Sequence, residues 1–455
     1  MYDILLVTFA VIFVLGVAIN IHEFGHFIVA KMFGMRVDAY SFFGLGPRIW
    51  GFKVGHTDYR ISAIPLGAYV KLYGDEATGP LEGKDDQAEV VPESEHYELR
   101  PRWQKFLVML GGPFMNLVLA FAIPFIGALA FGVPAMPAPI VGLVNSGGAA
   151  EQAQIKVGDR IVVFDGIENP TWQRIKNDSL IAPEKEIPVV VEREGKRVNL
   201  TITPKKTIQE GNTIGEIGFE PELGVEPVIA GRLVENEPAA KAGLQIGDTV
   251  VAFNGKAVKN SQTLTNDIRE NKGEPFALTV ERDGQRLDLQ MQSRENDDKV
   301  FRIGASFSAG EITNREPAGF GQATVFAWDS NIEIIRMTGK VFGQLFAGER
   351  SVKDAGVAGP VGIVQIIAQM VRAGGFAGLF PILMVISLNL GIFNLLPIPM
   401  LDGGQIAFLG IDKVLSWFGT ELSNGIKEKI QLTGLGIILL LMVLVMYLDI
   451  ARLFG

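Results

Sequence analysis

The 455-residue sequence contains no cysteine, which excludes disulfide bonds and thiolate metal ligands. Any tightly held metal must then be bound by histidine and carboxylate side chains, and the chain has only four histidines. Basic residues are outnumbered, because 41 Lys and Arg stand against 50 Asp and Glu for a formal net charge of -9, and no basic cluster stands out. The sequence therefore lacks the electrostatic footprint of a protein that binds nucleic acid.

Long apolar runs, in contrast, are abundant. Hydrophobic residues make up 48% of the chain, and four segments reach the roughly 20 residues that a bilayer requires. These segments cover about 4–30, 106–131, 376–397 and 432–448. The first is too long for a cleaved signal peptide and has no basic region before it. The sequence thus predicts a polytopic α-helical membrane protein with four transmembrane helices in the lipid bilayer.

The first apolar segment contains the motif His22-Glu23-Phe24-Gly25-His26. On a helix, two histidines four residues apart project from one face, so both imidazoles can bind one Zn²⁺, and Glu23 lies beside them as a candidate general base. An ionisable residue at membrane depth costs about 2.5–3.5 kcal/mol, so three of them within five residues need a partner or a task. The alternative is a pair of structural helix histidines with a surface glutamate.

Positive charge near the ends of the spans predicts the orientation of the chain. Basic residues follow the first span and precede the second: Lys31, Arg36, Arg48, Arg100, Arg102 and Lys105. We therefore expect the stretch 31–105 to be cytoplasmic. The large region from about 132 to 375 then lies outside, in the periplasm of a cell that has one.

This outer region contains an internal repeat with a constant offset of 89 residues. Gly158-Asp159 recurs as Gly247-Asp248, and Glu192-Arg193 recurs as Glu281-Arg282. Each copy has the pattern of a short helix, a turn, alternating strands and a hairpin around a glycine. The repeat alone predicts two similar α+β modules.

A third metal ligand has to come from another part of the chain, and Asp402 is the candidate. The first and third spans run in the same direction, which brings the histidines and Asp402 to a similar depth. Pro397 and Pro399 break the helix before Asp402, and Gly403-Gly404 allow an unusual backbone after it. The alternative is that Asp402 caps a helix over 405–418. The residues leave both readings open.

Several motifs together resemble the bacterial site-2 protease family of intramembrane zinc metalloproteases. They are the His22–His26 motif, Gly111-Gly112-Pro113-Phe114-Met115-Asn116 in the second span, the tandem repeats, and Asn394 through Gly403 in the third span. The string from Pro238 to Asp248 also resembles bacterial PDZ domains. The resemblance implies that His22, His26 and Asp402 bind zinc, that Glu23 is the general base, and that Asn394 assists substrate or transition-state binding.

The organisation predicted from these features has nine parts. They are the first span (1–30), a cytoplasmic segment (31–105), the second span (106–132), a first PDZ-like domain (133–222), a second PDZ-like domain (223–312), a region with an amphipathic helix (313–375), the third span with the Leu-Asp-Gly motif (376–404), a cytoplasmic loop or helix (405–430), and the fourth span with a short tail (431–455). We call 133–222 the first repeat and 223–312 the second repeat.

Three connecting segments carry further expectations. Tyr59–Tyr73 alternates β-forming residues around a Pro-Leu-Gly break, which predicts a β-hairpin. The resemblance implies that this hairpin is membrane-associated, with Tyr69 and Val70 as candidate substrate-binding residues. An ordinary cytoplasmic hairpin is the alternative. The acidic stretch 75–98 predicts a mobile loop. Ile332 and Phe346 belong to an amphipathic pattern that predicts either an interfacial helix or a helix packed on the second repeat.

The predicted function is zinc-dependent peptide hydrolysis inside the bacterial inner membrane. Substrates implied by the resemblance are single-span proteins already shortened on their outer side, such as anti-sigma factors or remnant signal peptides, cut in regulated intramembrane proteolysis. The PDZ-like domains would bind peptide ends or act as a steric filter. Two rivals are a proteolytically silent membrane scaffold that presents PDZ modules, and a membrane-tethered protease that cuts soluble peptides at the cytoplasmic surface.

Overall fold

The computed structural model describes residues 2–64, 67–74, 91–209, 212–295, 300–309, 315–350, 358–420 and 422–454. The chain divides into two compact units, each with its own core. Unit 1 comprises Met1–Val133, Pro317–Gly343 and Val357–Gly455, and unit 2 comprises Pro134–Glu316 and Gln344–Gly356.

Unit 1 is built mainly from helices. Their bounds are α1 Tyr2–Met32, α2 Arg102–Phe131, α7 Phe320–Phe346, α8 Pro360–Gly374, α9 Leu379–Asn394, α10 Asp402–Ser416 and α11 Asn424–Phe454, with short 3-10 turns η2 Glu93–Glu95 and η3 Gly375–Gly378. Within the described residues, four helical segments are long and apolar enough to cross a membrane: Asp3–Met32, Arg102–Phe131, Gly375–Asn394 and Gly425–Ala451. The four predicted spans are confirmed, although each differs from its expected bounds by a few residues. The apolar helix α8 was not foreseen.

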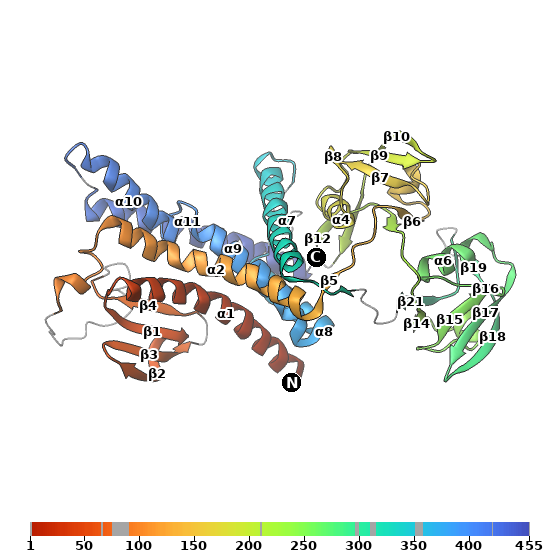
Figure 1. Cartoon of the computed structure of the whole chain (residues 1–455), viewed down its shortest axis with the longest axis horizontal. Helices are drawn as coiled ribbons and strands as arrows, with labels where there is room; N and C mark the ends of the chain where they lie inside the picture. The colour runs from red at the N-terminus through yellow and green to blue at the C-terminus, as the bar shows by residue number, and fades with distance from the viewer. Residues whose placement is uncertain are drawn as a thin grey trace. The chain divides into compact units, whose positions relative to one another are not determined.

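Helices α1, α2 and α9 pack against one another and form the centre of unit 1 (Figure 1). Their contact depends on glycine, because a side chain at Gly25 would overlap the backbone of Gly111. Helix α7 also joins this bundle: Asn331 donates a hydrogen bond to the Ala120 carbonyl of α2, and the Phe342 ring contacts the Phe393 ring of α9. This helix therefore packs on membrane-spanning helices.

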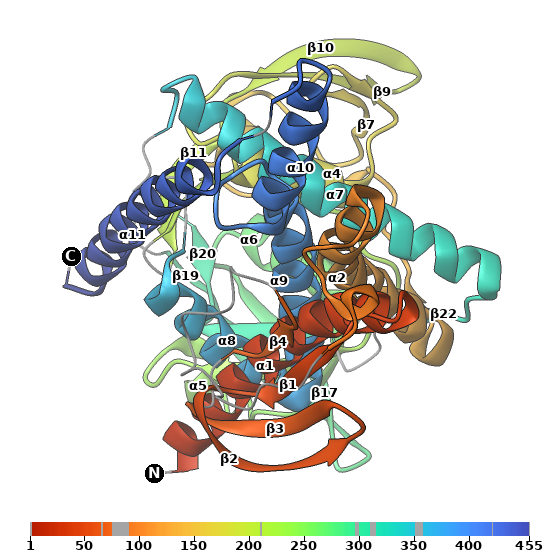
Figure 2. The same ribbon diagram turned by 90° about the vertical axis from the view of Figure 1, so that its left-hand side faces the viewer.

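A four-stranded sheet follows α1 and lies against it (Figure 2). Its strands are β1 Val37–Phe43, β2 Leu45–Val54, β3 Thr57–Ile64 and β4 Tyr69–Leu72, in the order β2-β3-β1-β4. The hairpin predicted over Tyr59–Tyr73 is wrong, because β1 lies between β3 and β4 and pairs with both. The hairpin of this sheet is formed by β2 and β3 instead. Most of the acidic loop expected at 75–98 lies outside the described residues.

Unit 2 contains the two repeats, and the 89-residue offset reappears in its elements. The first repeat has β6 Val141–Val144, α3 Ala149–Gln152, β7 Arg160–Phe164, β8 Ile167–Glu168, α4 Trp172–Leu180, β9 Ile187–Arg193, β10 Lys196–Ile202, β11 Lys205–Gln209, β12 Asn212–Glu216 and β13 Phe219–Pro221. The second has β14 Val228–Leu233, α5 Pro238–Lys241, β15 Thr249–Phe253, β16 Lys256–Ala257, α6 Ser261–Glu270, β17 Pro275–Arg282, β18 Gln285–Gln292, β19 Arg294–Glu295, β20 Phe301–Arg302 and β21 Ala305–Ala309. Short strands β5 Val133–Pro134 and β22 Arg315–Glu316 flank them.

Each repeat contains the same ion pair between a buried aspartate and a partly exposed arginine. Arg193 binds Asp159 at 2.7 Å in the first repeat, and Arg282 binds Asp248 at 2.6 Å in the second. Both arginines also donate to a backbone carbonyl at an equivalent position, which is Gln154 in the first repeat and Gly243 in the second. The two copies are therefore structural duplicates of one α+β module.

One difference between the copies strains the first. Gln154 has a φ of 60°, in the left-handed region that favours glycine, and its counterpart Gly243 has a φ of 85°. The backbone course that the two repeats share thus holds Gln154 in a conformation that is rare for a residue with a side chain, and its carbonyl group accepts a hydrogen bond from Arg193.

Candidate metal centre

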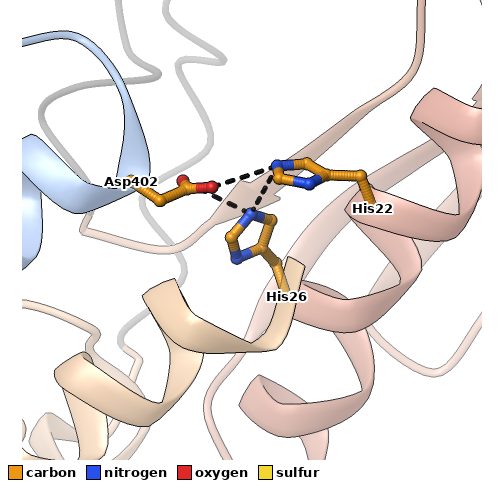
Figure 3. Close-up of side chains that lie close together, drawn as sticks. All are labelled: His22, His26 and Asp402. Atoms are coloured by element: carbon orange, nitrogen blue, oxygen red, sulfur yellow. Dashed lines mark hydrogen bonds and ion pairs between the residues drawn. The ribbon is translucent and has the colours of Figure 1, made fainter. Parts of the chain in front are cut away.

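Two histidines and one aspartate converge inside unit 1 (Figure 3). His22 and His26 project from the same face of α1, one turn apart, as their spacing predicts. Asp402 reaches them from the first turn of α10, and all three side chains are largely shielded from solvent. The structure therefore brings together the three residues that the sequence proposes as metal ligands.

The distances between their polar atoms suit a zinc ion. The two Nε2 atoms are 3.2 Å apart, His22 Nε2 is 3.1 Å from Asp402 Oδ2, and His26 Nε2 is 3.5 Å from Asp402 Oδ1. Zinc bonds of about 2.0–2.2 Å at tetrahedral angles separate neighbouring ligand atoms by about 3.3–3.5 Å. Asp402 Oδ2 is also buried without a hydrogen bond among the described residues. Two imidazoles and one carboxylate match the donor set of a catalytic zinc site with an open position.

Helix α2 leaves room for this cluster at Gly112. A Cβ atom there would lie 2.7 Å from His26 Cε1 and 2.9 Å from His22 Cε1, closer than ordinary van der Waals contact, and would overlap His26 Nε2. The residue before it, Gly111, meets Gly25 of α1 across the helix crossing. The two glycines of the second-span motif therefore have separate tasks: one allows the helices to approach, and the other leaves space for the imidazole rings.

A break in the chain turns Asp402 toward the histidines. Helix α9 ends at Asn394, and Met400 has a φ of 81°, which is rare for a residue with a side chain. A Cβ at Gly403 or at Gly404 would overlap the backbone of the preceding loop, so only glycine allows this tight turn. Asp402 begins α10, but Leu401 occupies the N-cap position. The alternative that Asp402 caps this helix is therefore wrong.

The remaining candidate residues lie beside the cluster. Asn394 Nδ2 is 3.3 Å from His22 Nε2, so its amide faces the same space as the ligand atoms. Glu23 follows His22 on α1, and its carboxylate faces the Val70 backbone of β4. Tyr69, one residue earlier on β4, has its ring covered by the Arg60 guanidinium at 5.2 Å. The edge strand β4 thus borders the candidate general base.

The other two histidines lie apart from this cluster. His56 is exposed in the turn between β2 and β3, and the His96 ring packs against the Tyr73 ring at 4.7 Å. Neither contributes to the group of potential ligands found in the described part of the chain.

Sequence reasoning missed the groups that contact the outer nitrogens of the two candidate ligand histidines. His26 Nδ1 lies 2.7 Å from the Val108 carbonyl oxygen, and His22 Nδ1 lies 3.1 Å from the Asn116 amide. Asn116 is fully buried on α2 and contacts Ser387 of α9. Its signal was visible as an asparagine inside an apolar span, since such a residue needs a polar partner.

Comparison with known proteins agrees with this geometry. The family model of peptidase family M50 matches residues 10–441. The regulator of sigma-E protease RseP of Escherichia coli strain K12 is 31% identical over 468 residues, which cover 96% of this chain and 97% of that protein. A protein with the same name from Salmonella typhimurium strain 14028s is 31% identical and covers 98% of each chain.

A Vibrio cholerae protein that is provisionally named a zinc metalloprotease is also 31% identical, and the alignment covers both chains completely. The expected family, enzyme class and zinc cofactor are confirmed by these matches. The chain belongs to peptidase family M50, the site-2 protease family of zinc metalloproteases.

Proposed function

We propose that this protein is an intramembrane endopeptidase that cuts the transmembrane segments of single-span proteins already shortened on their outer side. The observation that carries the proposal is the cluster of His22, His26 and Asp402 on helices that are part of the apolar bundle or adjoin it. A metal site at such depth acts on substrates that themselves enter the membrane. A rival site at the cytoplasmic surface would not need ligands on a 30-residue apolar helix.

Each residue near the cluster has a proposed task in peptide hydrolysis. Bound zinc, held by His22, His26 and Asp402, supplies Lewis-acid activation of water and of the scissile carbonyl. Glu23 accepts the proton that the attacking water loses and returns it to the leaving amine as the C–N bond breaks. Asn394 hydrogen-bonds the substrate backbone or the oxygen on which negative charge develops.

The edge of β4 is proposed to hold the substrate. A transmembrane helix satisfies its peptide groups internally, so cleavage requires that it unwinds and that other groups accept its free N–H and C=O groups. Strand β4 forms one edge of its sheet, and its Val70 backbone reaches Glu23. A substrate strand added at this edge would run past the catalytic base, with Tyr69 and Val70 as its first partners.

The two repeats are proposed to be PDZ-like domains on the periplasmic side of the bacterial inner membrane, with the metal centre near the cytoplasmic side. The basic residues that flank the first two spans support this orientation. The resemblance to regulators of a sigma factor supports substrates such as anti-sigma factors or remnant signal peptides, processed by regulated intramembrane proteolysis. We propose the bounds 133–222 for the first PDZ-like domain and 223–312 for the second.

Peptide binding is a second candidate task for the first repeat, and a cavity favours it. The cavity has a volume of about 690 Å³, and its lining includes Trp172 and Lys176 of α4, the segment 214–221, and Gln262 of the second repeat. A helix facing a strand is the usual place for an extended peptide on such a module. A purely steric filter would not need this cavity.

The experiment that tests the proteolytic proposal is co-expression with a panel of truncated single-span substrates. Cleavage inside the membrane segment by the wild type, and its loss in Glu23→Gln, is the expected result. Cleavage confined to the soluble flank would identify a membrane-tethered protease. Equal amounts of uncut substrate with both proteins would favour the silent scaffold.

Replacement of 141–308 by a flexible linker separates the repeats from the chemistry. If the repeats filter by size, the shortened protein cuts both trimmed and untrimmed substrates and binds zinc normally. If it folds and binds zinc but cuts neither, the repeats deliver the substrate and the filter proposal fails.

A further inference from the structure

The Gly-Gly-Pro-Phe-Met-Asn motif of α2 ends in Asn116, a polar residue that is not one of the proposed zinc ligands. Asn116 is 0% exposed and lies on a membrane-spanning helix, where a polar side chain is costly unless it is hydrogen-bonded. Its amide lies 3.1 Å from His22 Nδ1. It also lies within 3.4 Å of Ser387 Oγ on α9. Asn116 thus connects a proposed zinc ligand on α1 to a third helix.

Zinc ligation by His22 imposes a direction on the hydrogen bond to Asn116. A neutral imidazole carries one proton, and a nitrogen that binds metal cannot carry it. His22 turns Nε2 toward Asp402 and His26, so Nδ1 must hold the proton and donate it. His26 shows the same arrangement, because its Nδ1 faces the Val108 carbonyl oxygen, which can only accept. His22 therefore also needs an acceptor.

The structure places Asn116 Nδ2 toward His22 Nδ1 and Oδ1 toward Ser387 Oγ, and exchange of these two atoms brings an acceptor to the imidazole. Amide nitrogen and oxygen have nearly the same size, and their hydrogen-bond partners determine which of them occupies each position. With Oδ1 toward His22, Nδ2 faces Ser387 Oγ and donates to it. The Ser387 hydroxyl then donates to the backbone carbonyl oxygen of Asn116 at 2.9 Å. In this orientation the imidazole proton, one amide proton and the Ser387 hydroxyl proton each have an acceptor.

We propose that Asn116 is a positioning residue for the zinc site, whose Oδ1 accepts the His22 Nδ1 proton while Ser387 fixes the orientation of the amide. The inference rests on the proposed ligand role of His22. The hydrogen bond selects the tautomer that presents Nε2 to zinc and fixes the orientation of the ring. Outer partners of this kind raise metal affinity by about 10–100-fold.

The motif then acts as one unit. Gly111 lets α2 approach α1, Gly112 leaves space for the imidazoles, and Asn116 orients His22. Because Gly112 and Asn116 are four residues apart, both lie on the face of α2 that meets the histidines. The second span is therefore part of the metal centre, although it supplies no ligand.

The test measures zinc affinity of the purified full-length protein by competition with a chromophoric chelator. We expect Asn116→Leu to weaken binding about 10–100-fold, because leucine has a similar size and cannot accept a hydrogen bond. Asn116→Asp should stay within a few-fold of the wild type, because a carboxylate accepts the same proton. With Co²⁺ as the probe, the aspartate variant should keep the wild-type visible spectrum and the leucine variant should not.

A packing role would give a different ranking. If Asn116 only packs or only donates a hydrogen bond, the Asn116→Asp protein should bind zinc as poorly as the Asn116→Leu protein. This result would overturn the proposal. Asn331→Leu is the matched control, since Asn331 is also a buried asparagine bonded to α2 and should leave zinc affinity unchanged.

Two further variants keep the outcome interpretable. Ser387→Ala removes the group that orients the amide and should weaken zinc binding several-fold; if Asn116→Leu does not fold, unchanged affinity in Ser387→Ala overturns the proposal. Asp402→Ala separates this inference from the function on which it rests. If Asp402→Ala loses zinc while Asn116→Leu keeps it, only the role of Asn116 fails.

Discussion

Substitution of Gly112 by alanine would test the geometry of the metal centre with a single methyl group. The new Cβ would lie 2.7 Å from His26 Cε1 and 2.9 Å from His22 Cε1, where ordinary contact begins at 3.4 Å. The rings would have to move by at least about 0.5 Å, whereas zinc sites tolerate deviations of about 0.2 Å in their ligand distances. The nearest obstacles belong to two proposed ligands rather than to flexible surface groups.

We expect this displacement to lower zinc affinity by 100-fold or more, which corresponds to about 2.8 kcal/mol. The helix itself should not suffer, because alanine has a higher helix propensity than glycine by about 1 kcal/mol. A loss of zinc without a loss of folding is therefore the expected outcome.

The assay compares zinc content, thermal unfolding and substrate cleavage of Gly112→Ala with those of Gly127→Ala. Gly127 lies on the same helix, and a Cβ there meets no atom within 4 Å, so this variant should behave as the wild type. Normal zinc content and normal cleavage in Gly112→Ala would refute the position assigned to the histidines.

Three further predictions concern the groups around the cluster and in the second repeat. Val70→Pro removes the backbone N–H beside Glu23 and should abolish cleavage while zinc content stays normal; unchanged turnover would exclude β4 as the substrate edge. Asn394→Ala should retain zinc and lower kcat about 10²–10³-fold, as expected for the loss of a donor to a developing oxyanion; an unchanged kcat would remove it from the mechanism. In the second repeat, the side-chain hydrogen bond from Arg282 holds the pKa of the Asp248 carboxyl below its usual value. This carboxyl stabilises the fold above its unfolded pKa of about 3.9, and the contribution is lost as the pH falls through that value toward the lower folded pKa. The protection factors for hydrogen exchange in β15 and β17 should therefore fall below about pH 4–5, and in Asp248→Asn they should depend less on pH.

The residues that act through local spacing could be predicted from the sequence. The helical period places His22 and His26 on one face, and the constant offset of the repeats carries over from sequence to structure element by element. The depth of Asp402 followed from the direction of the spans. Its approach to the histidines needed the tight turn at Gly403-Gly404, which only the structure shows.

Features that depend on distant pairing could not be predicted in the same way. The alternation of residues in Tyr59–Tyr73 predicted strands but not which strands pair. In the structure, β1 lies between β3 and β4, the two strands that were expected to pair with each other. The task proposed for Asn116 depends on where α1 crosses α2, which is where Gly25 meets Gly111. Neither the strand order of the sheet nor the crossing point of α1 and α2 produces a periodic pattern in the sequence.

The most direct test of the proposed metal centre is zinc content measured together with cleavage in Glu23→Gln and Asp402→Ala, with His56→Ala as the control. We expect about one zinc per chain and no cleavage in Glu23→Gln, a loss of both zinc and cleavage in Asp402→Ala, and wild-type behaviour in His56→Ala. Full zinc occupancy with full turnover in Asp402→Ala would contradict the assignment of the third ligand and the metal centre built on it.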